Sequence, residues 1–99
     1  MFSFESLGQT GYKLTVNGRV LFIDPYLSNS VERLEGEELK RMVPIRIEPD
    51  QISDAEWVLV THIHLDHCDL DTLLPISNAS PQCCFLGSFE VIEYLAENG

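Results

Sequence analysis

The sequence has few basic residues: six lysines and arginines stand against sixteen aspartates and glutamates, and the formal net charge is −10. Binding to nucleic-acid phosphates depends on clustered cations, so this shortage argues against nucleic acid as a partner. An anionic membrane surface is disfavoured for the same reason. We interpret most of the acidity as a contribution to solubility, while a few carboxylates remain available to hold metal cations.

Cysteines and long apolar runs are also scarce. The three cysteines, Cys68, Cys83 and Cys84, are odd in number and two of them are adjacent, so they do not form a disulfide framework. The first residues have no basic stretch followed by an apolar run, and no segment reaches transmembrane length. Together these absences predict a cytoplasmic protein, in a reducing compartment, with no membrane partner.

Apolar residues are nevertheless numerous enough for a folded core. The 44% hydrophobic content is typical of globular chains and not of disordered segments. Residues 11–16 alternate apolar and polar side chains, and the following Asn17-Gly18 turn predicts a β-hairpin. The apolar run 20–23 lacks alternation, so we expect a central strand that is buried on both faces. Two more buried strands are expected at residues 57–61 and 83–86.

Helical patterns alternate with these strands. Residues 28–42 have charged side chains at helical spacing and a weak apolar stripe, which predicts a surface helix. A short helix is expected at residues 70–74, limited by Pro75, with Asp69 and Asp71 as its caps; the alternative for Asp69 is to order the segment before the helix. A last helix follows the capping residue Ser88. This alternation indicates an α/β fold with helices covering a sheet, in a single domain over residues 1–99.

All three histidines lie within six consecutive positions, in the segment HIHLDH that directly follows a predicted strand. Alternate side chains of an extended segment point to the same side, so His62 and His64 are placed to bind one metal ion, while Asp66 and His67 follow where the chain turns. Imidazole and carboxylate ligands suit zinc, manganese or iron, and the lack of thiolates argues against a closed structural zinc site. The metal would lower the pKa of bound water towards ~7, and Asp66 would orient the hydroxide. The alternative is a loop of capping or solvent-exposed histidines.

The segment VLVTHIHLDHCD resembles the HxHxDH signature of the metallo-β-lactamase superfamily of metal-dependent hydrolases. The segments LFIDPYLSNS, ERLEGEELKRMVPIRIEPDQI and DTLLPIS are similar to the branch typified by L-ascorbate-6-phosphate lactonase. The resemblance implies an α/β (α+β) fold that forms the N-terminal half of an αββα sandwich, with a mixed sheet and flanking helices.

The resemblance also implies roles for particular residues. His62 and His64 would bind a first divalent metal ion, zinc or manganese, and Asp66 and His67 would bind a second one. Asp66 would be the catalytic residue that positions the nucleophilic water. Asp24 matches an aspartate that lies beneath the site and orients a ligand histidine. The alternative for Asp24 is a cap of the turn before Pro25. Tyr26 and Ser28–Ser30 are placed either at the substrate mouth or in a plain loop, and the resemblance assigns no definite substrate-binding residue.

The implied function is that of a lactonase-like hydrolase, in which metal-activated water attacks a cyclic ester of a small sugar acid, phosphorylated or not. The complete domain of this superfamily has about 200–250 residues, and its later half supplies further ligands, whereas this sequence has no histidine after His67. We therefore expect an N-terminal fragment with an incomplete site that is inactive by itself. The alternatives are a non-catalytic interaction module, a half-domain that needs a homo-oligomer or a complementary C-terminal half, and a small metal-buffering protein.

Overall fold

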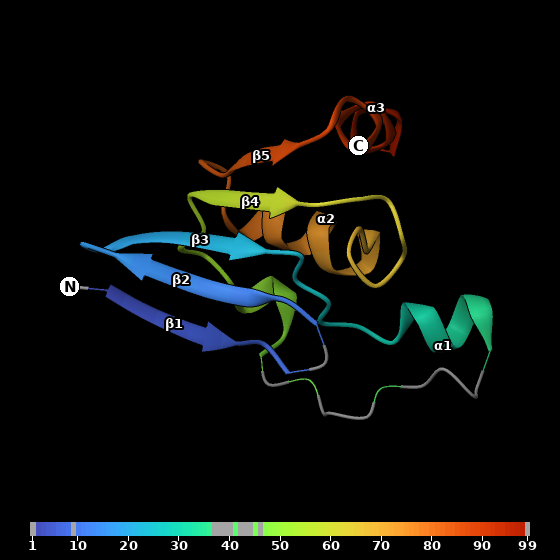
Figure 1. Cartoon of the computed structure of the whole chain (residues 1–99), viewed down its shortest axis with the longest axis horizontal. Coiled ribbons are helices and arrows are strands. Elements are labelled where there is room, and N and C mark those ends of the chain that lie inside the picture. Colours follow the sequence, from blue (N-terminus) through green and yellow to red (C-terminus); the bar gives the residue numbers. More distant parts are fainter. Residues whose placement is uncertain (1, 9, 37–40, 42–44, 46, 99) are drawn as a thin grey trace.

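The computed structural model of the protein describes residues 2–8, 10–36, 41, 45 and 47–98. The strands are β1 (Phe2–Ser6), β2 (Tyr12–Val16), β3 (Arg19–Ile23), β4 (Trp57–Val60) and β5 (Cys84–Gly87). They form one sheet in the order β1-β2-β3-β4-β5 (Figure 1). The pairs β1–β2 and β2–β3 are antiparallel, whereas β3–β4 and β4–β5 are parallel. The predicted mixed sheet of an α/β fold is therefore confirmed.

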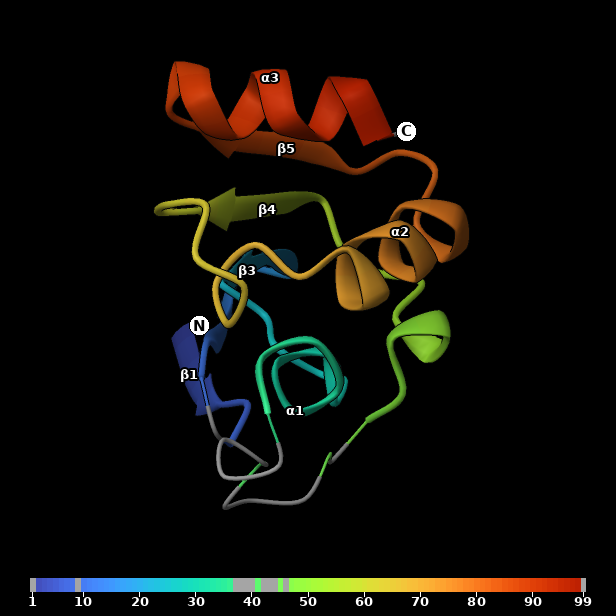
Figure 2. The same cartoon turned by 90° about the vertical axis from the view of Figure 1, so that its right-hand side faces the viewer.

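Helices connect the parallel strands, as crossover connections require. The helical elements are α1 (Ser30–Glu35), the 3-10 turn η2 (Pro49–Gln51), α2 (Leu70–Ala79) and α3 (Phe89–Asn98). Figure 2 shows α2 and η2 on the same side of the sheet. The helix predicted for residues 28–42 is seen as α1, and residues 37–40 and 42 of that prediction lie outside the described residues. No helix of the described segments has the length and apolar character needed to span a bilayer.

The hydrophobic core lies between α2, η2 and one face of the sheet. Phe22 of β3 and Val58 of β4 are fully buried there, against Leu73 and Ile76 of α2. Burying one such side chain contributes roughly 1.5–3 kcal/mol. The core therefore fixes α2 beneath the ends of β3 and β4, where the histidine segment begins.

The strand β3 is central in the sheet, but the prediction that it is buried on both faces is wrong. Val20 and Phe22 point into the core and are buried, whereas Leu21 and Ile23 point to the other face and remain half-buried. The apolar run predicted an element packed on both sides. In the described part of the chain, packing elements lie on one side only.

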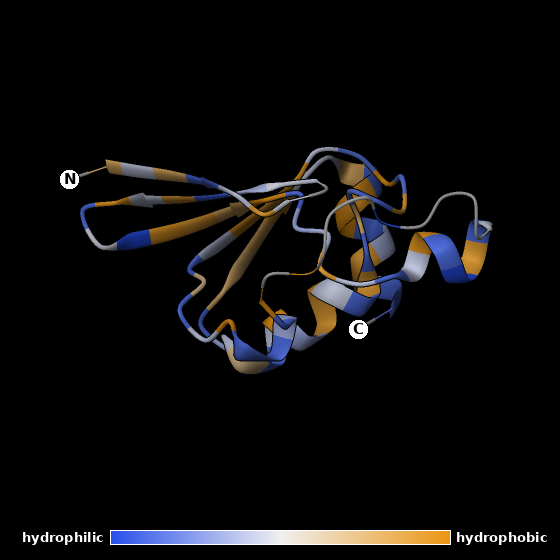
Figure 3. Ribbon diagram, turned by 90° about the horizontal axis from the view of Figure 1, so that it is seen from below, coloured by the Kyte–Doolittle hydropathy of each residue, from blue (hydrophilic) through white to orange (hydrophobic). Residues whose placement is uncertain are grey.

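The second face of the sheet, which we call the open face, is apolar. The strand register places Phe4, Leu14, Leu21 and Trp57 side by side across four strands. Phe4 is 57% exposed and Trp57 is 37% exposed. Figure 3 shows apolar residues recurring along these strands, and no helix of the described residues lies across them. Soluble monomers rarely expose a contiguous apolar patch of this kind.

The helix α2 does not end before Pro75, as the sequence predicted, but continues through it to Ala79. Pro75 has no backbone N–H to donate to the carbonyl group of Asp71, so the helix lacks one internal hydrogen bond. Leu73 and Ile76, on either side of the proline, are buried in the core. Their burial outweighs the lost hydrogen bond and keeps the helix intact.

Candidate metal centre

The segment HIHLDH forms a compact loop at the carboxyl end of β4, drawn in yellow in Figure 1. The backbone N–H groups of His67 and Cys68 both donate to the carbonyl oxygen of His64, at 2.9 and 2.8 Å. This turn brings the imidazoles together: the ring centre of His62 lies 4.7 Å from that of His64 and 4.0 Å from that of His67. The structure therefore places the His64 and His67 rings next to that of His62.

Asp66, the fourth predicted ligand, lies beside them. Its Oδ2 is 3.7 Å from Nε2 of His67, and its side chain is 46% exposed. Three imidazoles and a carboxylate are donor types that zinc and manganese accept, so these residues fit a divalent cation chemically. Among the described residues, however, no three or more His, Cys, Asp or Glu side chains have the spacing of a metal cage. The loop thus brings metal-binding residue types together, but these residues do not form such a cage.

Asp24 lies next to this loop because the parallel strands β3 and β4 end at the same edge of the sheet. Its backbone N–H donates to the carbonyl oxygen of Leu59 at 2.9 Å, and its φ of 47° is in the left-handed region. This conformation costs a non-glycine residue about 1–2 kcal/mol. Backbone strain of this kind clusters at functional sites, where the surrounding structure enforces it.

The buried carboxylate of Asp24 connects two neighbouring parts of the loop. Its Oδ1 accepts a hydrogen bond from the backbone N–H of Thr61 at 2.7 Å, and its Oδ2 accepts one from Thr61 Oγ1 at 2.6 Å. The same Oδ2 lies 2.8 Å from Nδ1 of His67. A carboxylate can only accept, so Nδ1 of His67 is the donor and its Nε2 is not engaged by Asp24.

Gly11 makes room for Asp24. It has a φ of +96°, and a Cβ atom at this position would lie 2.3 Å from the carbonyl oxygen of Asp24. Such a distance is an overlap with backbone, and the positive φ independently favours glycine. The residue directly before β2 must therefore lack a Cβ for the backbone of Asp24 to lie this close. The sequence marked Gly11 only as the start of a strand and did not indicate this contact.

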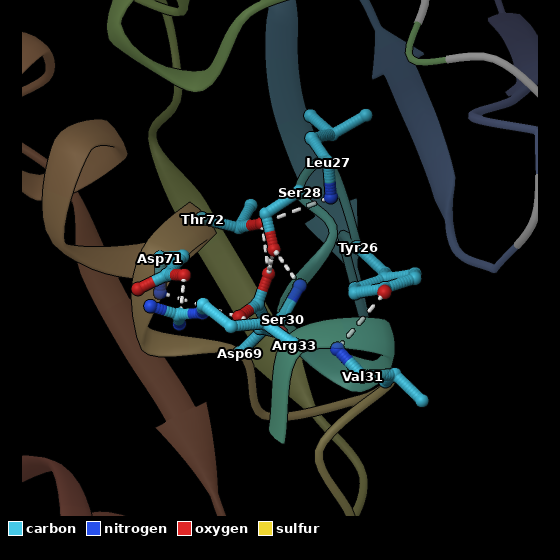
Figure 4. A network of polar contacts seen from close by, with 9 residues as sticks. All are labelled: Tyr26, Leu27, Ser28, Ser30, Val31, Arg33, Asp69, Asp71 and Thr72. Atoms are coloured by element: carbon cyan, nitrogen blue, oxygen red, sulfur yellow. Dashed lines mark hydrogen bonds and ion pairs between the residues drawn. The ribbon is translucent and has the colours of Figure 1, made fainter. Parts of the chain in front are cut away.

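A second polar cluster, the Asp69 cluster, lies at the start of α2 (Figure 4). The fully buried carboxylate of Asp69 accepts hydrogen bonds from the hydroxyl groups of Ser28 and Ser30, both at 2.6 Å, and of Thr72, at 2.5 Å. It also accepts from the backbone N–H of Asp71 at 3.2 Å, so the prediction that Asp69 caps the helix is confirmed. The cluster ties the segment after β3 to α2.

Asp71, predicted as a second cap, has a different role. Its carboxylate forms an ion pair with Arg33 of α1. Both side chains are substantially exposed, and exposed ion pairs contribute about 0.2–1 kcal/mol. The pair therefore adds little to the attachment that the Asp69 cluster already provides.

Tyr26 and Ser28–Ser30 were candidates either for the substrate mouth or for a plain loop. Tyr26 is 2% exposed, and its hydroxyl accepts from the backbone N–H of Val31 at 3.2 Å. Arg41 lies over the ring at 4.8 Å and donates to the Tyr26 carbonyl oxygen at 2.6 Å. Ser30 is also buried, in the Asp69 cluster. Tyr26 and Ser30 are therefore packed inside the described structure, whereas Ser28 is half-buried and Asn29 is exposed.

Cys68 follows the last histidine directly but is packed into the core. Burial raises the pKa of its thiol, and the carboxylates of Asp69 and Asp24 raise this pKa further. Cysteine binds metal ions as a thiolate, and the raised pKa keeps the Cys68 thiol protonated. Cys68 is thus a core residue in the described structure.

A hollow of about 690 Å³ borders the candidate metal centre. Its lining includes His64 and Asp66 together with Leu34 of α1, Leu65 and Tyr94 of α3. The hollow therefore places apolar side chains next to two of the predicted ligands.

Most of this chain is similar to known proteins. The family model of the Beta-lactamase superfamily domain matches residues 19–99. The chain is also 28% identical over 91 residues to a metal-dependent hydrolase of Aeropyrum pernix, and 25% identical over 91 residues to one of Hyperthermus butylicus. These matches cover 92% of this chain but 31% and 34% of the relatives. The chain thus spans about one third of the length of the curated relatives it matches.

Two solved structures have a similar fold. A metallo hydrolase from Ignicoccus hospitalis gives a TM-score of 0.64 at 20% identity, over 99% of this chain and 36% of that one. A possible metal-dependent hydrolase from Veillonella parvula gives a TM-score of 0.70 at 27% identity, over 99% of this chain and 39% of that one. The first likeness concerns the fold alone. None of these four names states a substrate.

Proposed function

The chain belongs to the beta-lactamase superfamily, and we propose that it contributes the N-terminal part of the metal site of a lactonase-like hydrolase. The observation that carries this proposal is the contact of the His62, His64 and His67 imidazoles at the carboxyl end of β4. The names of the relatives, which are metal-dependent hydrolases, support the requirement for a divalent metal.

In this proposal, His62 and His64 would hold one cation, and Asp66 and His67 would hold another. Zinc or manganese bound there would lower the pKa of water to about 7 and polarise an ester carbonyl group. The exposed carboxylate of Asp66 accepts a hydrogen bond from the attacking water and aims it at the carbonyl carbon. Asp24, through its contact with Nδ1 of His67, keeps that ring oriented.

The proposed substrate class is a cyclic ester of a small sugar acid, with or without a phosphate group. The resemblance to the L-ascorbate-6-phosphate lactonase branch supports it, and the hollow beside His64 and Asp66 provides space for the ester. The sequence contains no histidine after His67. A complete site therefore needs ligands beyond these 99 residues, and we expect weak metal binding and little activity from them alone.

Metal binding tests the first part of this proposal. We expect the protein to bind Zn²⁺ or Mn²⁺, and the double variant His62→Ala, His64→Ala to bind it about tenfold more weakly or worse, because two imidazoles are removed. Isothermal titration calorimetry gives the affinity, and metal analysis after dialysis gives the stoichiometry. The variant Cys83→Ser, Cys84→Ser is the control for binding to the adjacent thiols and is expected to retain the metal. Equal affinity in wild type and the histidine variant would contradict the proposal.

Hydrolysis tests the second part. The protein is mixed with the part of the Veillonella parvula relative that this match does not cover and with Zn²⁺ or Mn²⁺, and the opening of an aryl lactone is followed by absorbance. We expect turnover in the mixture that is lost in the histidine double variant. A metal-loaded mixture that opens no lactone but hydrolyses another ester or amide would overturn the lactonase assignment and keep the hydrolase.

The open face supports a second candidate function, that of a half-domain which docks to a complementary half. Its proposed occupant is the further length that the relatives have, about twice that of this chain, because these matches cover 31% and 34% of them. The cross-strand row Phe4, Leu14, Leu21 and Trp57 is the surface that this second half would cover.

The open face predicts that the protein by itself associates in solution. In sedimentation velocity we expect species heavier than one chain, and we expect Leu14→Glu to shift them towards the monomer because it places a charge at the centre of the apolar face. Leu74→Glu is the matched control, since Leu74 is exposed on α2, away from the open face. A wild-type protein that stays monomeric at high concentration would count against this docking surface.

A further inference from the structure

We infer that Thr61 is a positioning residue that fixes the proton of His62 on Nδ1, so that Asp24 orients one histidine directly and a second one through Thr61. The hydrogen-bond inference concerns the metal-free protein, and its consequence for metal binding rests on the proposed function. Thr61 is the residue between β4 and His62 and was not among the residues that the sequence singled out.

The contacts of the Thr61 hydroxyl group determine its role. Thr61 Oγ1 lies 2.6 Å from Oδ2 of Asp24 and 2.8 Å from Nδ1 of His62. A hydroxyl group has a single proton to donate, and a carboxylate can only accept. The Thr61 proton therefore points to Asp24. Towards His62 the hydroxyl oxygen is an acceptor, which requires a proton on Nδ1 of that ring.

Asp24 imposes the same tautomer on His67, because Nδ1 of His67 lies 2.8 Å from the same carboxylate oxygen. Both rings then carry their proton on Nδ1 and present an unprotonated Nε2. A neutral imidazole binds a metal only through its unprotonated nitrogen, and the other nitrogen's hydrogen bond decides which one that is. One carboxylate thus prepares two rings whose centres are 4.0 Å apart.

Backbone hydrogen bonds hold this relay of contacts, from Asp24 through Thr61 to His62, in place. The backbone N–H of Thr61 donates to Oδ1 of Asp24 at 2.7 Å, so both carboxylate oxygens hold the same residue. Asp24 is buried and is held by its own backbone bond to Leu59. The hydroxyl group therefore lies at a fixed place beneath His62. Serine would supply the same oxygen, whereas valine would keep the shape and lose it.

The test is the tautomer of each histidine in the metal-free protein, read from two-bond ¹H–¹⁵N correlations of the imidazoles at a pH where they are neutral. We expect Nδ1–H for His62 in wild type and in Thr61→Ser, and a loss of that preference in Thr61→Val. His67, whose contact with Asp24 remains, is the internal control and is expected to keep Nδ1–H in all three proteins. Zn²⁺ affinity is expected to fall about tenfold in Thr61→Val and to recover in Thr61→Ser.

Two results would overturn the inference: a wild-type His62 protonated on Nε2, or a folded Thr61→Val protein with an unchanged His62 tautomer. If Thr61→Val fails to fold, the wild-type and Thr61→Ser spectra still decide the first point. If the tautomers are as expected but none of the proteins binds Zn²⁺, the proposed metal site fails and the hydrogen-bond relay stands.

Discussion

The variant Asp69→Ala is expected to be about 3–5 kcal/mol less stable than the wild type, a large part of the roughly 5–15 kcal/mol that holds a domain folded. Asp69 is 0% exposed, and its carboxylate accepts from the hydroxyl groups of Ser28, Ser30 and Thr72. Alanine leaves the buried hydroxyl groups of Ser30 and Thr72 without that acceptor, at a cost of about 1–3 kcal/mol each before the structure relaxes. It also removes the cap of α2, which is worth about 0.5–2 kcal/mol.

Urea unfolding followed by circular dichroism measures this difference. Asp71→Ala is the matched control, because Asp71 lies in the same helical turn, carries the same charge and pairs with Arg33 on the surface. It is expected to cost about 1 kcal/mol or less. If Asp69→Ala is no more destabilising than Asp71→Ala, the Asp69 cluster does not hold the segment after β3 to α2.

The local parts of the fold could be predicted from the sequence because their causes are local. Asn17 and Gly18 form the turn of the hairpin with φ values of 50° and 82°, as such turns require. The burial of Leu21 and Ile23 was overestimated because a run of apolar residues does not indicate whether another element packs on each face of the strand. The helix through Pro75 was missed because the burial of Leu73 and Ile76 is a tertiary effect.

The same division holds for the candidate site. His62, His64 and His67 are neighbours in sequence, so their contact follows from one turn of the chain. The role of Asp24 was predicted from a family resemblance. Its contact with Thr61 joins residues 37 positions apart in the chain, so no local sequence pattern predicts it. The Asp69 cluster could not be predicted for the same reason, since its serine partners are 39 and 41 positions away from Asp69 in the chain. Parallel pairing of β3 and β4 creates both clusters.

Asp24→Asn is expected to lower Zn²⁺ affinity by about 10–100-fold without unfolding the protein. Asparagine tolerates the left-handed backbone of residue 24 and fills the same volume. With its oxygen kept towards the Thr61 backbone N–H, its NH₂ group takes the place of Oδ2. That group donates to Nδ1 of His67, which then carries its proton on Nε2. The Thr61 hydroxyl now accepts from the NH₂ group and donates to His62, whose proton also moves to Nε2.

A single amide thus reverses both tautomers, and the two nitrogens that would bind metal become protonated. Isothermal titration calorimetry with Zn²⁺ and the imidazole ¹⁵N spectra of the metal-free variant measure the two halves of this expectation. Asp54→Asn is the control for the lost charge, because Asp54 is an exposed carboxylate that pairs with Lys13 at 3.6 Å. The side chain of Lys13 points to the opposite face of the sheet from that of Trp57. A folded Asp24→Asn protein that binds Zn²⁺ as tightly as Asp54→Asn would show that Asp24 orients neither histidine, since the carboxylate and the amide would then serve the site equally well.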